Sequence, residues 1–219
     1  MGLISQLPKS SEVGRIVPKN AFDSYANTKQ RKLFSEKIER IRWTHKLALD
    51  TINLQGREVG EIQIFEIELR DREEIEEILT IIDRAVPYPI LFVLKHKNME
   101  NWRISKKHLH PTNENNAVID WTFSSSWFDS SDVRFELNLK GSLDEVFRNL
   151  CLQITGKTSI SREKDISSIV EEEKKAKELL VKIEKLKFRI ANEKQFNRRV
   201  ELNLELQKIQ LDYDEIFPQ

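Results

Sequence analysis

The side chains best suited to chemistry lie on one predicted strand, residues 61–69, and just beyond its end. Glu66, Glu68 and Arg70 occupy alternate positions there, with apolar residues between them. Successive side chains of a strand point to opposite faces, so the two carboxylates and the guanidinium share one face. Two acids beside a cation can hold a divalent metal ion and steady a phosphate under attack. Cleavage of a phosphodiester is therefore one use of this pattern.

In a restriction-endonuclease-like nuclease core, carboxylates on adjacent strands hold Mg²⁺, and Glu68 and Arg70 are similar to its Glu-x-Lys half. Asp50 is the well-placed residue for the acid on the preceding strand. Arg70 departs from that core, because a guanidinium that stays ionised is a poor proton donor or acceptor. One hypothesis is therefore a Mg²⁺-dependent nuclease that uses Asp50, Glu66, Glu68 and Arg70. The alternative, which we favour, is that Glu66 and Glu68 form ion pairs on a solvated or interface-facing sheet surface and that the protein needs no cofactor.

A second set of candidates is basic and surrounds a predicted hairpin that also contains Trp102. The candidate nucleic-acid ligands are Lys95, Lys97, Arg103, Lys106 and Lys107. Basic side chains can contact phosphates, and an aromatic ring among them can stack a base. The alternative is a solvated hairpin. His108 and His110 have no third ligand within reach in the sequence, so we predict no metal site.

A third candidate is a polar loop, residues 124–131, that carries Trp127 and Phe128. Two large aromatic side chains in such a loop either anchor a protein interface or fold back onto the sheet. Folding back is the commoner outcome for such side chains, and an interface anchor is the alternative.

The most informative stretch is the C-terminal quarter. Residues 157–217 contain no glycine and no proline, and apolar residues recur there every three or four positions. The first half of the stripe follows a heptad at Ile169, Ala176, Leu179, Ile183, Leu186 and Ile190. The second half includes Val200, Leu204 and Leu211. A helix with such a stripe must pack against another helix. The heptad breaks at residues 192–197, which favours two antiparallel helices, although one long coiled coil with a partner satisfies the same pattern.

The middle of the chain predicts a βαβ unit. Residues 61–69 alternate as a strand, Asp71 can cap a helix after it, and Pro87 and Pro89 end that helix. Residues 90–94 are wholly apolar, as in a strand that is buried on both faces. A strand, a helix and a second strand in this order favour a parallel, right-handed crossover.

The flanking elements complete an α/β fold. A helix is predicted to begin at Thr28 and to continue through Ile41, before a short strand at residues 51–54. Further strands are predicted at residues 102–104, 117–123 and 133–139. Ser142 can cap a last helix that ends at Gly156. The predicted organisation is a weakly structured leader and connector (1–27), an α/β domain (28–156), a polar linker (157–168) and a helical hairpin or coiled coil (169–217).

Composition narrows the class of protein. Among 219 residues, 36 Lys and Arg balance 36 Asp and Glu, so no overall basic field draws the chain to nucleic acid. The single cysteine, Cys151, excludes an internal disulfide and suits a reducing compartment. No apolar run approaches the ~20 residues of a membrane span, and the first residues lack the pattern of a signal peptide. We therefore expect a cytoplasmic protein with no membrane contact.

Several pieces of the sequence, taken in order, resemble a bacterial family known only as a domain of unknown function. The pieces are IRW at 41–43, KL at 46–47, TIN at 51–53, EIQIFEIEL at 61–69, IDRAVPYPI at 82–90, DW at 120–121 and EKQFNRRVELN at 193–203. The resemblance runs from about Pro18 to Leu211. It implies a bacterial protein encoded beside a helicase and a DNA methyltransferase in restriction-like or phage-defence gene neighbourhoods. It implies no catalytic residues.

These observations together favour a non-catalytic accessory subunit of a defence or restriction-like complex. The apolar stripe of the C-terminal helices would bind a nucleic-acid enzyme, such as the helicase or methyltransferase of the same operon, or a second copy of the chain. The divergent Mg²⁺ nuclease and a nucleic-acid-binding adaptor are the alternatives.

Overall fold

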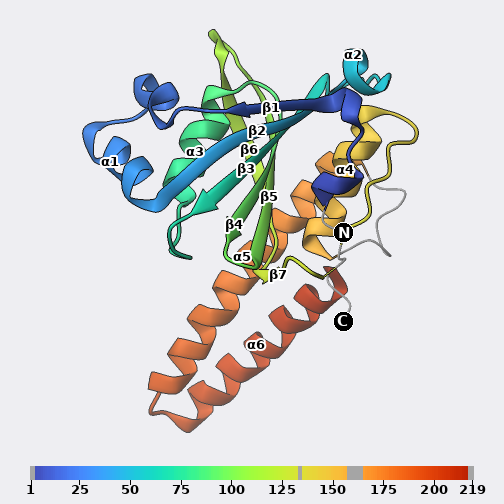
Figure 1. Cartoon of the computed structure of the whole chain (residues 1–219). Helices are drawn as coiled ribbons and strands as arrows, with labels where there is room; N and C mark the ends of the chain where they lie inside the picture. The colour runs from blue at the N-terminus through green and yellow to red at the C-terminus, as the bar shows by residue number, and fades with distance from the viewer. Residues whose placement is uncertain (1–2, 133–134, 157–164, 217–219) are drawn as a thin grey trace. The chain divides into compact units, whose positions relative to one another are not determined.

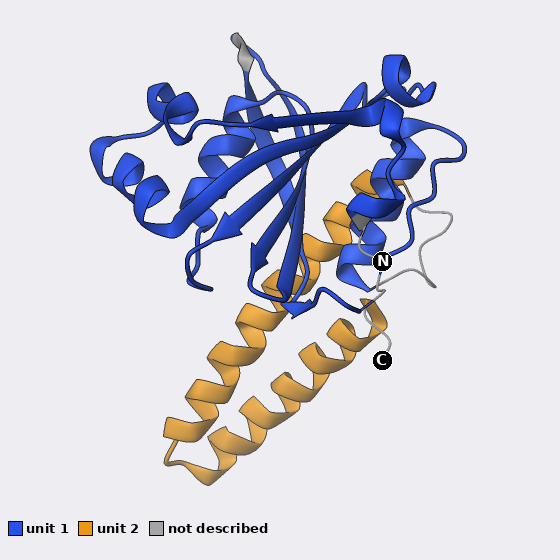
Figure 2. Cartoon of the chain, in the orientation of Figure 1, with its two compact units in different colours: residues 1–160 blue, residues 161–219 orange. Residues whose placement is uncertain are grey.

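The computed structural model describes residues 3–132, 135–156 and 165–216 of the chain, which forms two compact units (Figures 1 and 2). Residues 1–160 make up the first unit, and residues 161–219 make up the second. The first is a mixed α/β structure and the second consists of two long helices. The predicted α/β class, followed by long C-terminal helices, is thus present.

Seven strands form one mixed sheet in the first unit. They are β1 (Glu12–Ile16), β2 (Ile38–Ala48), β3 (Glu61–Leu69), β4 (Ile90–His96), β5 (Met99–His110), β6 (Asn113–Ser124) and β7 (Phe128–Asp129). The first six lie side by side in chain order, and β7 pairs with β5. Strands β3 and β4 run parallel, whereas the other neighbouring pairs are antiparallel. The sheet is therefore a set of antiparallel connections with one parallel crossover inside it.

That crossover is the βαβ unit expected from the sequence. Helix α3 (Glu76–Ala85) connects β3 to β4, and apolar residues such as Ile78 and Ile82 are buried along it. Pro87 and Pro89 follow the helix and stop it, because proline cannot donate a backbone hydrogen bond. Asp71 does not cap α3 as predicted. Its carboxylate accepts the backbone N–H of Glu73 in a turn, and the helix begins later.

The N-terminal region differs most from the predictions. The expected leader contains three short 3-10 helices (Leu3–Gln6, Lys9–Ser11 and Lys19–Tyr25) and strand β1, which pairs with β2. Helix α1 (Thr28–Lys37) begins where predicted, although Asn27 rather than Thr28 caps it, and it ends before Ile38. Residues 38–48 form a strand, because pairing with β3 outweighs the helical spacing of the apolar residues. The predicted strand at 51–54 is a helical turn instead, α2 (Leu49–Ile52).

The second half of the first unit agrees better with the sequence. Strands β5 and β6 are longer than the segments predicted for them. The strand predicted at 133–139 is wrong for residues 135–139, which have no regular structure, and Val133 and Arg134 lie outside the described residues. Helix α4 (Leu143–Thr155) has the predicted capping box of Ser142 and Glu145. Gly156 ends it in the left-handed conformation, φ 74°, as predicted.

Both faces of the central strands are covered. One hydrophobic cluster joins α1, α3 and the third 3-10 helix to side chains of β3 and β4, including Phe65, Ile67 and Phe92. The alternate side chains of β3, such as Ile62 and Ile64, are also fully buried, and α4 contacts β3, β5 and β6. The central strands of the sheet therefore have helices on each side.

The second unit is a helical hairpin. Helix α5 (Ile166–Asn192) and helix α6 (Phe196–Ile216) are joined by three residues and pack against each other. This break falls within the predicted segment 192–197. Within the described parts of the chain, every helix is too short or too polar to span a lipid bilayer.

Candidate functional site

Glu66, one of the two carboxylates predicted on β3, belongs to a row of alternating charges across four strands, and Glu68 pairs with Arg40. Glu66 lies in register with Arg42 of β2, and its carboxylate is 2.6 Å from the ammonium group of Lys95 on β4. Lys95 in turn lies 3.7 Å from Glu100 of β5, whose other oxygen accepts the indole N–H of Trp102. Glu66 is largely buried, and two cations compensate its charge. These contacts agree with the ion-pair interpretation of the strand.

The structure separates the four residues of the nuclease hypothesis. Ala48 pairs with Glu61 at one end of β3, and Glu68 lies at the other end, opposite Arg40. Seven residues of strand span about 23 Å, so Asp50, two residues beyond Ala48, cannot share one metal ion with Glu68. The carboxylate of Asp50 instead binds Lys46 at 2.6 Å, and this hydrogen bond lowers the pKa of Asp50.

The metal site proposed from these four residues is therefore wrong. Arg70 is engaged elsewhere, since its guanidinium lies 2.5 Å from the carboxylate of Glu39. In residues 3–132, 135–156 and 165–216, no cluster of three or more His, Cys, Asp or Glu side chains is arranged to hold a metal ion.

The predicted basic surface is also dispersed. Arg103 and Lys107 lie four residues apart on β5 and face α3, where they meet Glu76 and Asp83. The Lys107 ammonium group donates to the Asp83 carboxylate at 2.7 Å and to the backbone C=O groups of Asp83 and Val86. Burial lowers the pKa of Lys107. Two of the five predicted nucleic-acid ligands are therefore buried ion-pair partners.

The other three predicted ligands do not restore a basic surface. Lys95 is paired with Glu66, and Lys97 occupies the turn between β4 and β5 with φ 55°. Lys106 alternates with Lys107 along β5, so it projects from the opposite face of the sheet.

The sequence did contain a signal for the buried pairs. Glu76 and Asp83 are seven residues apart on a helix, about 10 Å, which is close to the four-residue spacing of Arg103 and Lys107 on a strand, about 13 Å.

The aromatic loop folds back onto the sheet. Phe128 is only 4% exposed, and its ring lies 5.9 Å from that of Trp102 and 5.3 Å from that of Phe135. Trp127 packs against the hydrophobic cluster beneath α3. Phe128 therefore agrees with the fold-back interpretation, since β7 pairs with β5, and Trp127 is partly buried.

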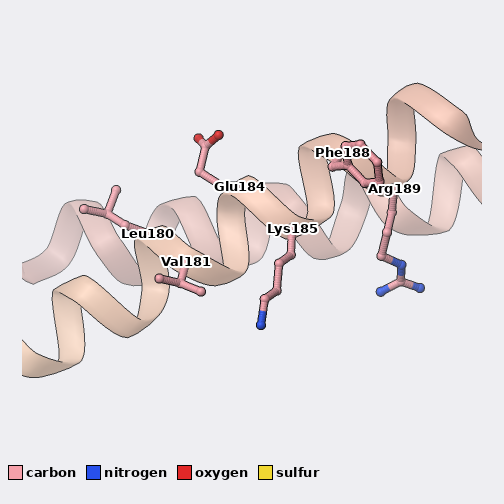
Figure 3. Close-up of a pocket in the computed structure, with 6 residues that line it drawn as sticks. All are labelled: Leu180, Val181, Glu184, Lys185, Phe188 and Arg189. Atoms are coloured by element: carbon pink, nitrogen blue, oxygen red, sulfur yellow. The ribbon is translucent and has the colours of Figure 1, made fainter.

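The stripe predicted to bind a partner on α5 is buried within the chain. The buried members are Ile169, Ala176, Leu179, Ile183 and Leu186, and Ile190 is partly buried. A different set of apolar residues on α5 is exposed, namely Leu180, Val181 and Phe188. At 100° per residue, Val181 and Phe188 lie on the side of the helix opposite Ile183 and Leu186. They line an open pocket together with Leu180, Glu184, Lys185 and Arg189 (Figure 3).

Helix α6 repeats this two-sided pattern. Leu202 is buried, whereas the predicted residues Val200, Leu204 and Leu211 are exposed. The same helical arithmetic places these three with Phe196 on the side opposite Leu202. We call Leu180, Val181 and Phe188 the α5 outer stripe, and Phe196, Val200, Leu204 and Leu211 the α6 outer stripe. Sequence reasoning found most of the α6 outer stripe and missed that of α5.

A comparison with models of protein families identifies the family of this chain. The family model described as Domain of unknown function (DUF4391) matches residues 6–212. The chain belongs to the DUF4391 family. Neither the curated proteins nor the solved structures include a match to it. The DUF4391 match covers both the sheet and most of the helical hairpin, so the two units are parts of one family architecture.

In this DUF4391 chain, the α6 outer stripe, most of which was predicted, and the α5 outer stripe, which was not, are both accessible. Glu66, Arg103 and Lys107 are buried in ion pairs, and Phe128 of the aromatic loop is part of the core. The outer stripes carry large apolar side chains in contact with solvent at regular helical spacing. They are the candidate functional site.

Proposed function

We propose that this DUF4391 chain is a non-catalytic docking subunit, which binds a protein partner through the outer stripes of its C-terminal hairpin. The observation that carries the proposal is the exposure of Phe188 and Phe196, at 72% and 76%, on a hairpin whose seam already buries a separate apolar set. Full burial of one such side chain contributes about 1.5–3 kcal/mol. Leaving two ordered stripes in water is unfavourable unless a partner covers them.

The charges around the α5 outer stripe suit a protein interface. Glu184, Lys185 and Arg189 flank Val181 and Phe188 in the open pocket (Figure 3). An apolar centre with a mixed polar rim is the usual composition of an interface between proteins. Both signs of charge are present, so the rim can set the orientation of a partner without a strong overall field.

We further propose that the partner is a nucleic-acid enzyme, such as a helicase or DNA methyltransferase, in a bacterial defence or restriction-like complex. The gene neighbourhood implied by the family resemblance supports this choice. The charge distribution supports it as well, because Arg103 and Lys107 are neutralised inside the fold. Contacts to nucleic acid are accordingly assigned to the partner rather than to this chain.

The test is the mass of the purified chain in solution, measured by light scattering alone and after co-expression with its genomic neighbours. We expect the chain to be a monomer when it is alone and to form a complex with a neighbour after co-expression. A stable homo-oligomer that recruits no neighbour would contradict the proposal and would mean that the outer stripes pair with a second copy.

A further inference from the structure

A hollow of about 220 Å³ opens at the carboxyl ends of the two parallel strands, beside the first turn of α3. It lies within the first unit, and its walls include Leu69 of β3, Leu94 of β4, Ile75, Asn101, Arg103 and Trp127. In α/β sheets, ligands bind in the crevice outside the carboxyl ends of the parallel strands. The hollow lies at the corresponding place beside the one parallel pair of this sheet.

Arg103 supplies an unsatisfied donor in the wall of the hollow. Its side chain is 4% exposed, and one terminal nitrogen binds the carboxylate of Glu76. The Nε atom of Arg103 is buried and meets no hydrogen-bond acceptor in the part of the chain that the structure describes. A buried charged donor without an acceptor is unfavourable, and the fork of a guanidinium matches a carboxylate or a phosphate. The unpartnered Nε of Arg103 is thus a donor suited to an oxyanion.

The start of α3 points to the same kind of ligand. The first N–H groups of an α-helix have no partner within the helix, and they carry a partial positive charge. Ile75 is the N-cap of α3 and has no side-chain acceptor to offer them. Ile75 and Glu76 both line the hollow. The first turn of α3 and the buried side chain of Arg103 therefore line the same small space.

We propose that this hollow binds a small oxyanion, a carboxylate or a phosphate group, with Arg103 and the N-terminus of α3 as its ligands. The volume sets the size of the ligand, because pockets for drug-sized molecules hold about 300–1,000 Å³, more than is present here. The site takes a free anion or the charged end of a larger molecule. This inference is independent of the docking function, since it concerns the sheet and not the hairpin.

Glu76 acts as an internal competitor for the ligand. Its side chain is 60% exposed, in contrast to that of Arg103, and it reaches the guanidinium from the outer side. An incoming anion takes the place of this carboxylate, which then turns into solvent. Two more acids lie on the rim. Glu73 is neutralised by Lys37, and Glu74 is exposed near Arg72.

The experiment is a titration of the full chain, labelled with ¹⁵N, with inorganic phosphate and separately with acetate. The Nε–H resonance of Arg103 is followed, with sodium chloride as the ionic-strength control. We expect a saturable shift of this resonance with at least one of the two anions, and the tighter anion identifies the class of ligand. Glu76→Gln should bind about tenfold more tightly, because a hydrogen bond to a charged group is worth at least that factor.

Glu77→Gln is the matched control, since Glu77 lies in the same turn of α3, is exposed, and accepts a hydrogen bond from Gln30 instead. It removes the same charge and should leave the affinity close to that of the wild type. Equal affinity of the two variants would overturn the role of Arg103. A linear shift with both anions that sodium chloride reproduces would overturn the site itself.

Discussion

Lys107 and Asp83 form an ion pair inside the protein, with 2.7 Å between Nζ and Oδ1 and neither side chain exposed to solvent. Lys107 also donates to two backbone C=O groups at the end of α3. The pair therefore holds α3, the crossover helix, against β5. The second carboxylate oxygen of Asp83 is buried and has no hydrogen-bond partner among the described residues, so the site depends strongly on its cation.

Removal of one member of this pair should destabilise the fold severely. Lys107→Met leaves the Asp83 charge buried and unpaired, and we expect a loss of about 3–5 kcal/mol in the free energy of unfolding. Urea denaturation measures the change. Lys29→Met, on the exposed side of α1, is the control and should be neutral within about 0.5 kcal/mol. The double variant Asp83→Leu with Lys107→Met should recover most of the loss, and a double variant as unstable as the single one would refute this account.

A second prediction concerns Asp144 in the first turn of α4. Its carboxylate accepts the backbone N–H groups of Arg57, Glu58 and Val59, at 2.6, 3.0 and 2.8 Å, and so holds the loop before β3. Asp144→Ala should lower the free energy of unfolding by about 1.5–3 kcal/mol. Asp144→Asn keeps one acceptor oxygen, so its free energy of unfolding should lie between those of the wild type and Asp144→Ala. If the alanine variant denatures at the same urea concentration as the wild type, the carboxylate does not hold this loop.

A third prediction links His45 to stability at acidic pH. Burial lowers the pKa of His45 in the folded state below its ordinary value of 6.5, while Glu12 opposes the shift more weakly. As the pH falls below about 6.5, the unfolded chain takes up the proton first, so the folded state loses stability.

The measurement for His45 is the free energy of unfolding at pH 7.5 and at pH 5.5. The wild type should lose more stability between these values than His45→Gln, which has no titrating group at this position. Identical pH dependence in the wild type and His45→Gln would contradict the assignment.

Local signals made much of the fold predictable. The β3–α3–β4 unit and the capped ends of α4 depend on alternation, proline and capping residues that lie close together in the sequence. The segment after α1 was misassigned because Ile38 and Ile41 continue the helical spacing of that element. Their strand conformation depends on β3, more than twenty residues further along the chain.

The sites were harder to predict than the fold, because the role of a charged side chain depends on which residues contact it in the folded protein. Arg103 and Lys107 resemble nucleic-acid ligands until α3 brings Glu76 and Asp83 against them. Similarly, the α5 heptad identifies a helix that must be covered, but α6 supplies a cover within the same chain. The exposed apolar side of each helix is then the surface that a partner can bind. Residues such as Val181 and Phe188 can be assigned to that surface once the buried seam between α5 and α6 is known.

The most direct test of the docking function compares two variants of α5 in the complex with the co-purifying neighbour. Phe188→Asp places a charge in the α5 outer stripe, whereas Lys182→Asp changes an exposed residue that lies outside both the stripe and the buried seam. Isothermal titration of each purified chain with the neighbour gives the Kd, and circular dichroism verifies that the helix content is unchanged. We predict that Phe188→Asp weakens binding at least tenfold, a change of about 1.4 kcal/mol, and that Lys182→Asp leaves Kd within about threefold of the wild type. Equal Kd values for Phe188→Asp and the wild type would contradict the claim that the hairpin docks through this stripe.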